Sequence, residues 1–262
     1  MSVFQAAFLG LVQGLTEFLP VSSSGHLALM SHFLAVENPG LTFEIVLHFG
    51  TLLSVLVYFH RQLWRMFLSL FKREMKEERR QIGLLFIGTL PAVVIGLSFK
   101  QQFESVSNQP RVVALLLCVT GFLLLLPHLV PKKGDRSMTL RSALIMGFGQ
   151  ALAILPGISR SGSTIVSGML CGVNSAKAAE FSFLLAVPAI SGATLLALRD
   201  LEGIDTTLVI PYLVGGIVSF VSGLIAVYAV LSSIRRGKFA YFAYYCIAVG
   251  VIAFIYLQFS QA

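Results

Sequence analysis

The feature that most constrains this chain is a polar stretch enclosed by two apolar segments, each too short to cross a membrane. The stretch reads Gln-Gly-Leu-Thr-Glu-Phe-Leu-Pro-Val-Ser-Ser-Ser-Gly-His, and residues 3–12 and 27–34 flank it. A helix that crosses a bilayer needs about 20 apolar residues. We therefore predict that the chain enters the membrane, breaks between Pro20 and Gly25, and returns. Irregular backbone at that depth is tolerated only where protein covers it or a wet cavity adjoins it, so the polar break is a candidate site.

A second copy of this pattern lies further along the chain. A shift of 137 residues places six residues on identical ones, namely Gly10, Gln13, Leu15, Ser22, Ser24 and Gly25 on Gly147, Gln150, Leu152, Ser159, Ser161 and Gly162. Among the positions that differ, Glu17, Ser23 and His26 of the first copy are replaced by Ile154, Arg160 and Ser163 in the second. One copy thus holds an acid and a base, and the other holds a fixed cation. We predict that the two tips are halves of one site.

The rest of the chain is typical of a polytopic membrane protein. Of its 262 residues, 56% are hydrophobic and only 12% are charged, which disfavours a soluble domain. Residues 1–8 lack the basic start of a cleavable signal peptide. A second broken hairpin is expected over residues 144–173, and six spans are expected at residues 43–59, 82–99, 112–129, 178–198, 208–231 and 240–259. We predict one all-α integral membrane domain over residues 1–262, with one repeat at about 3–130 and the other at about 140–260.

The distribution of basic residues predicts how the chain is oriented. Residues 61–81, 131–141 and 235–238 hold seven, four and three Lys or Arg residues, and such segments stay in the cytoplasm. This arrangement puts the C-terminus outside and lets the first hairpin enter from the outer face and the second from the cytoplasmic face. Because three spans separate equivalent points, the repeats are inverted. Inverted repeats with broken helices are typical of transporters.

Ionisable side chains at membrane depth are candidates for function. Glu17 needs a partner there, either Arg160 or a bound cation, and the alternative is a purely structural ion pair. Serine becomes a nucleophile when a base removes its proton, and histidine is the usual base. His26 with Ser23 or Ser24 fits that role. The alternative is that these serines cap the following helix, which we favour for Ser22.

Arg160 lies just before an apolar segment that Ser163 and Thr164 open. Backbone amides at a helix start and a guanidinium together favour an anion such as phosphate; the alternative is an arginine on a cytoplasmic loop. Gln13 lies one turn before Glu17 and is predicted to orient it, to add an oxygen to a cation site, or to bond another helix. Three residues near span ends are interpreted as snorkelling or paired with each other, namely Glu44, His48 and Glu180. Three histidines are interpreted as interfacial, namely His32, His60 and His128. The three cysteines, Cys118, Cys171 and Cys246, are interpreted as small buried hydrophobic residues.

Both tips closely resemble the signature motifs of bacterial undecaprenyl-diphosphatase, the BacA/UppP type, and the resemblance extends over the whole chain, including residues 180–188. It implies an inner-membrane enzyme that converts undecaprenyl diphosphate to undecaprenyl phosphate and inorganic phosphate. That reaction recycles the lipid carrier of cell-wall synthesis and confers bacitracin resistance. The resemblance also implies an active site open to the periplasm and a divalent cation, Mg²⁺ or Ca²⁺. The implied partners are the polyprenyl diphosphate and the bilayer, without nucleic acid, and a homodimer is left open.

The resemblance also assigns roles to individual residues. Glu17 is the acidic residue and candidate cation ligand, Ser23 the nucleophile or a hydroxyl ligand, and His26 the catalytic histidine. Arg160 binds phosphate, and the expected substrate-binding residues are Gln13, Ser22, Ser24, Ser159, Ser161 and Thr164. Many family members have Glu in place of Gln13 and Thr in place of Ser24. Attack by an activated water in place of Ser23 stays open, as does a transporter or flippase, which would not need the serine–histidine tip.

Overall fold

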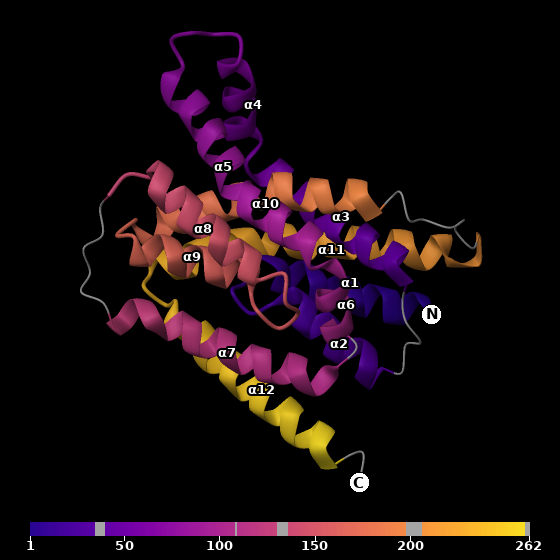
Figure 1. Ribbon diagram of the computed structural model, residues 1–262. Coiled ribbons are helices and arrows are strands. Elements are labelled where there is room, and N and C mark those ends of the chain that lie inside the picture. The colour runs from indigo at the N-terminus through magenta and orange to yellow at the C-terminus, as the bar shows by residue number, and fades with distance from the viewer. Residues whose placement is uncertain (35–39, 108, 130–135, 198–205, 260–262) are drawn as a thin grey trace.

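A computed structural model of the protein describes residues 1–34, 40–107, 109–129, 136–197 and 206–259. Within these residues the chain is helical, with short turns and one isolated β-bridge between Arg136 and Val173. Figure 1 shows the arrangement of the helices, which are α1 (Val3–Phe18), α2 (Ser23–Phe33), α3 (Gly40–Tyr58), α4 (His60–Ser69), α5 (Lys76–Ser98), α6 (Lys100–Ser107), α7 (Pro110–Leu129), α8 (Leu140–Leu152), α9 (Arg160–Leu170), α10 (Ser175–Ala197), the 3₁₀ turn η2 (Thr206–Leu208), α11 (Val209–Arg235) and α12 (Ala240–Phe259).

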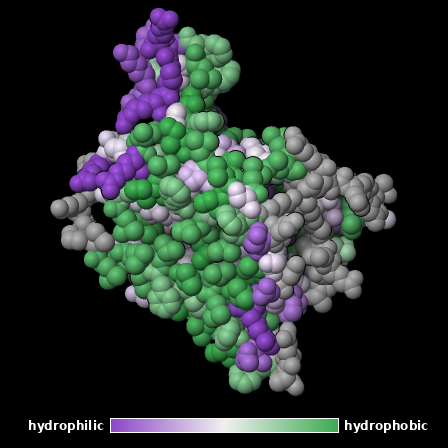
Figure 2. Space-filling model, viewed as in Figure 1, coloured by the Kyte–Doolittle hydropathy of each residue, from purple (hydrophilic) through white to green (hydrophobic). Residues whose placement is uncertain are grey.

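Five of the described helices are long and apolar enough to cross a membrane, namely α5, α7, α10, α11 and α12. A sixth span results if α3 and α4, which are bent by 76° at their junction, are counted as one. The predicted all-α membrane fold with about six spans is confirmed. Apolar side chains cover most of the body of the molecule in Figure 2, as expected for a surface that faces lipid.

The four helices of the two hairpins are shorter than a span. α1, α2, α8 and α9 have 16, 11, 13 and 11 residues. At 1.5 Å per residue the longest is about 24 Å, against about 30 Å for the hydrocarbon core. The break predicted between Pro20 and Gly25 is present, because α1 ends at Phe18 and α2 begins at Ser23. The tip of each hairpin, between its two short helices, therefore lies within the body of the molecule.

The first helix of each hairpin packs against a long helix of the other repeat. α1 packs on α11, and α8 packs on α5. Equivalent glycines make both contacts possible: a Cβ atom on Gly10 would lie 2.3 Å from the carbonyl oxygen of Gly215, and one on Gly147 would lie 2.4 Å from that of Gly88. Only glycine permits such close approach of two backbones. This exchange of partners ties each hairpin to the other repeat.

The basic segment 61–81 is more ordered than a loop. α4 and the first turns of α5 form an extension that projects from the body in Figure 1, and Figure 2 shows it hydrophilic on one side and hydrophobic on the other. Arg79 fastens it by donating to the carbonyl oxygens of Ser69 and Lys72, at 2.9 Å and 2.7 Å from Nη2. Residues 100–107, between two of the long helices, form the short helix α6. Of the basic segment 131–141, residues 131–135 lie outside the described residues.

Candidate active site

Glu17 is the centre of the contacts between the two hairpin tips. Its side chain, on the last turn of α1, is only 5% exposed, and both of its carboxylate oxygens have partners. Ser23 and Gln13 donate to Oε2, with Ser23 Oγ at 2.6 Å and Gln13 Nε2 at 2.9 Å. Arg160, the first residue of α9, donates from Nη2 to Oε1. The acid of the first repeat thus contacts the cation of the second, as the sequence comparison predicted.

Equivalent serines begin the second helix of each hairpin. Ser22 caps α2 by accepting from the amide of Gly25 at 3.3 Å, and its backbone adopts a positive φ of 69°. Ser159 caps α9 in the same way, accepting from the amide of Gly162 at 3.0 Å. Capping satisfies an amide that the first turn leaves unpaired. The capping interpretation of Ser22 therefore fits the structure, and Ser159 uses its hydroxyl likewise.

The two capped helices bring their N-terminal ends to one place. Ser23 and Arg160 are the first residues of α2 and α9, and both contact Glu17. A helix N-terminus carries a partial positive charge and favours an anion beside it. Two such ends and a guanidinium, enclosed by protein, form a strongly anion-binding region. Nη1 of Arg160 is buried and has no hydrogen-bond partner among the described residues, so it is available to a ligand.

The predicted contact between His26 and Ser23 is not formed. His26 is buried, and its ring turns back so that Nδ1 donates to the carbonyl oxygen of Ser22 at 2.8 Å. Nε2 lies 3.0 Å from the hydroxyl of Tyr245 on α12, and the two rings stack with an interplanar angle of 7°. Both ring nitrogens are therefore occupied, because the ring points along its own helix turn and toward α12. In this arrangement His26 holds the tip in place.

A different histidine approaches the carboxylate. His48 Nε2, on α3, lies 3.8 Å from Glu17 Oε2. Its Nδ1 donates to the backbone carbonyl oxygen of Glu44 at 2.8 Å. His48 thus contacts Glu44 through the backbone of Glu44 and not through its carboxylate. Its side chain is 31% exposed, compared with 5% for Glu17. The contact with Glu17 was not predicted, although a histidine within an apolar span is itself a signal of function.

The remaining residues predicted to bind substrate fasten the tips to each other and to α10. Ser161 Oγ donates to the carbonyl oxygen of Leu19, across the interface between the hairpins, at 3.0 Å. Thr164 Oγ1 donates to the carbonyl oxygen of Arg160 at 2.8 Å and lies 2.6 Å from the hydroxyl of Ser182. Ser24 Oγ lies 3.4 Å from Ser22 Oγ. In this structure these hydroxyls support the tips.

The hairpins offer few ligands for a divalent cation. Glu17 is the one acidic residue in the four hairpin helices and their tips, and both its oxygens are already engaged. No group of three or more His, Cys, Asp or Glu suited to a metal ion occurs in the described part of the chain. Gln13 Oε1 is a buried oxygen with no partner among the described residues, but it is neutral. Divalent cations such as Mg²⁺ prefer carboxylate oxygens, so these residues do not fit a site held by the protein alone.

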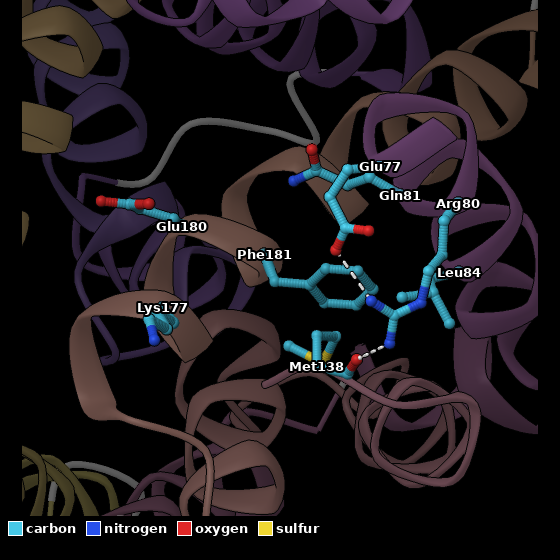
Figure 3. Close-up of a pocket in the computed structure, with 8 residues that line it drawn as sticks. All are labelled: Glu77, Arg80, Gln81, Leu84, Met138, Lys177, Glu180 and Phe181. Atoms are coloured by element: carbon cyan, nitrogen blue, oxygen red, sulfur yellow. Dashed lines mark hydrogen bonds and ion pairs between the residues drawn. The ribbon is translucent and has the colours of Figure 1, made fainter. Parts of the chain in front are cut away.

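A pocket elsewhere on the molecule has no link to the tips. It lies where α5 and α10 meet the segment that precedes α8 (Figure 3), and Arg80 crosses it to reach Glu77 at 2.8 Å and the carbonyl oxygen of Met138 at 2.6 Å. Its lining residues are Glu77, Arg80, Gln81, Leu84, Met138, Lys177, Glu180 and Phe181. The candidate site is therefore defined by the chemistry of the tips and not by this pocket.

Comparison with known proteins identifies the family. The family model described as "Bacitracin resistance protein BacA" matches residues 6–252. The chain belongs to the BacA family. Among its relatives, a protein named undecaprenyl-diphosphatase from Rhodopirellula baltica is 44% identical over 95% of this chain and 96% of its own length. Proteins of the same name from Syntrophotalea carbinolica and Bacteroides fragilis are 43% and 40% identical, over 97% and 98% of this chain and 98% and 99% of their own lengths. Both hairpin tips lie within the part of the chain that matches the BacA family.

Proposed function

We propose that the protein hydrolyses undecaprenyl diphosphate to undecaprenyl phosphate and inorganic phosphate, and so recycles the lipid carrier of cell-wall synthesis and confers bacitracin resistance. The observation that carries the proposal is the meeting of Glu17, Ser23 and Arg160 at two helix N-termini. These groups supply a hydroxyl, an acceptor for its proton and a fixed cation for the phosphoryl oxygens. Membership of the BacA family, whose similar members bear the undecaprenyl-diphosphatase name, supports the choice of substrate.

The contacts suggest how the residues divide the work. The Ser23 hydroxyl already donates to Glu17 Oε2, so the carboxylate is positioned to accept the proton when Ser23 Oγ attacks the terminal phosphorus. The bond from that phosphorus to the bridging oxygen breaks, and its electrons leave with undecaprenyl phosphate. Water then releases the phosphate from Ser23. Arg160 and the amides at the two helix starts stabilise the charge on the phosphoryl oxygens.

Arg160 serves both Glu17 and the substrate in this scheme. Nη2 stays on the carboxylate, and the unpartnered Nη1 turns to a phosphoryl oxygen. The hairpins lack the carboxylates needed to hold a divalent cation by themselves, so a cation that takes part would have to be held by the diphosphate as well. Such a cation would neutralise part of the diphosphate charge. His26 and Tyr245 keep the first tip in position.

The site is proposed to open toward the periplasm from the inner membrane. The basis is that Lys and Arg are concentrated in residues 61–81, 131–141 and 235–238, and such basic segments stay in the cytoplasm. The first of these segments contains α4 and the start of α5. Cysteines introduced at Gln81 and Gln261 test this orientation with a reagent that does not cross membranes. Labelling of intact cells is expected at Gln261 only, and labelling at Gln81 would refute the assignment.

The experiment for the activity uses the whole protein, purified in detergent, where no transmembrane gradient exists. Phosphate release from undecaprenyl diphosphate is measured for the wild type, for Glu17→Gln and for the control Glu180→Gln. Glu180 is a matched carboxylate in an exposed ion pair with Arg235 at 2.9 Å, away from the tips. Release is expected from the wild type and the control, with nearly none from Glu17→Gln. A folded wild type that releases no phosphate refutes the proposal and favours a transporter or flippase.

A further inference from the structure

One glutamine of the second repeat is buried without any partner for its amide. Gln150, on the last turn of α8, is 3% exposed, and neither Nε2 nor Oε1 has a hydrogen-bond partner among the described residues. The other buried side-chain atoms without partners there are Gln13 Oε1 and Arg160 Nη1, which also belong to the hairpins. Unpaired buried polar groups are rare because they are costly, so a cluster of them points to a ligand.

The repeat indicates which ligand the amide is built for. Gln150 is the counterpart of Gln13, and Arg160 is the counterpart of Ser23. In the first repeat, Gln13 Nε2 and Ser23 Oγ converge on one carboxylate oxygen, at 2.9 Å and 2.6 Å. The second repeat keeps a donor at both positions but has a hydrocarbon, Ile154, where the carboxylate would be. Gln150 Nε2 and the unpartnered Nη1 of Arg160 therefore suit an anionic oxygen that the second repeat does not supply, while Nη2 of Arg160 stays on Glu17.

The packing of the second hairpin keeps this amide beside the anion-binding helix start. α8 packs directly on α9. At Gly149, next to Gln150, an added Cβ atom would lie 2.9 Å from the carbonyl oxygen of Ser163 and 2.5 Å from Ser167 Oγ. The last turn of α8 thus lies against the first turns of α9, the helix that Arg160 begins. Gln150 lies on that turn, in the same hairpin as the positive helix end at which Arg160 stands.

We propose that Gln150 is a substrate-binding residue whose Nε2 donates to a phosphoryl oxygen of the polyprenyl diphosphate, alongside Nη1 of Arg160. Its Oε1 then accepts from water. The second repeat in this way holds the diphosphate, while the first repeat supplies Ser23 and Glu17. This inference rests on the proposed function, because it takes the diphosphate as the anion.

The test measures binding separately from hydrolysis. The probe is a polyprenyl diphosphate analogue with a methylene group in place of the bridging oxygen, titrated into the full-length protein in detergent. Gln150→Leu is expected to weaken its binding about tenfold or more, since a hydrogen bond to a charged group is lost. Gln150→Glu is expected to weaken it further by placing a negative charge against the phosphoryl oxygens. The thermal midpoint of Gln150→Leu should not fall, because the amide has no partner to lose among the residues that the structure describes.

Two results would overturn the inference. One is a folded Gln150→Leu protein that binds the probe within about twofold of the wild type. The other is severe loss of stability in both Gln150→Leu and the unbranched Gln150→Met, which would show that the amide serves the fold. Failure of the proposed function looks different: the wild type then binds the probe but releases no phosphate from the natural diphosphate.

Discussion

The ion pair between Glu17 and Arg160 makes a quantitative prediction for the variant Arg160→Ala. The side chains of Glu17 and Arg160 are 5% and 16% exposed, so the pair is buried. Removing one partner of a buried pair leaves an uncompensated charge, which costs about 3–5 kcal/mol. Ser23 and Gln13 still donate to the carboxylate, so we expect a loss near the lower end, about 3 kcal/mol in the free energy of unfolding. Turnover of the protein that stays folded should fall about a hundredfold or more, because phosphoryl charge is no longer stabilised.

A second substitution separates the two effects. In the double variant Arg160→Ala with Glu17→Gln, the buried charge is gone, so most of the lost stability should return while turnover stays low. The assay is chemical unfolding in detergent, run beside phosphate release at saturating lipid substrate. The difference between single and double variants measures the coupling of the pair. The reasoning is refuted if Arg160→Ala unfolds like the wild type, or if the double variant is as unstable as the two single losses added together.

Two further predictions concern the tips and their support. Ser23→Ala should lose nearly all turnover, measured as phosphate release, while Ser22→Ala should mainly cost stability, about 1 kcal/mol for a lost helix cap; near-normal turnover in Ser23→Ala would exclude direct attack by serine and favour an activated water. Gly147→Ala should lower the free energy of unfolding by about 1–3 kcal/mol, because its Cβ would lie 2.4 Å from a backbone carbonyl oxygen of α5. Gly83→Ala is the control, since nothing lies within 4 Å of its Cβ, and equal effects of the two would contradict the packing argument.

The hairpins could be predicted from the sequence because their signal is local. Short apolar segments around a proline- and serine-rich break have few alternatives in a membrane, where every backbone group must be satisfied. The contact between Glu17 and Arg160 was also accessible, since the repeat pairs an acid with a cation at equivalent tips. In the structure α1 and α8 each pack on a long helix of the other repeat, at Gly10 and Gly147, which the repeat matches, against Gly215 and Gly88, which it does not.

Side-chain direction and the packing of distant segments could not be predicted from the sequence. The closeness of His26 to Ser23 in sequence suggested a base and its nucleophile, but the ring direction is decided by a backbone carbonyl oxygen and by Tyr245, 219 residues away. His48 reaches Glu17 only because α3 packs beside α1. Neither contact follows from local periodicity. The role proposed for Gln150 rests on its burial and its unpartnered amide, neither of which the sequence shows.

The central claim is that two hairpin tips from opposite repeats form one phosphatase site. Its most direct test is phosphate release by Arg160→Lys, with the folded fraction followed in the same samples. Lysine keeps a charge for Glu17, so the protein should stay folded, but it loses the planar fork that serves the carboxylate and the phosphoryl group together. We expect turnover to fall at least about tenfold, to a value between the wild type and Arg160→Ala. Wild-type turnover in a folded Arg160→Lys protein would contradict the claim, because a charge alone would then suffice and the second tip would contribute no directed contact to the reaction.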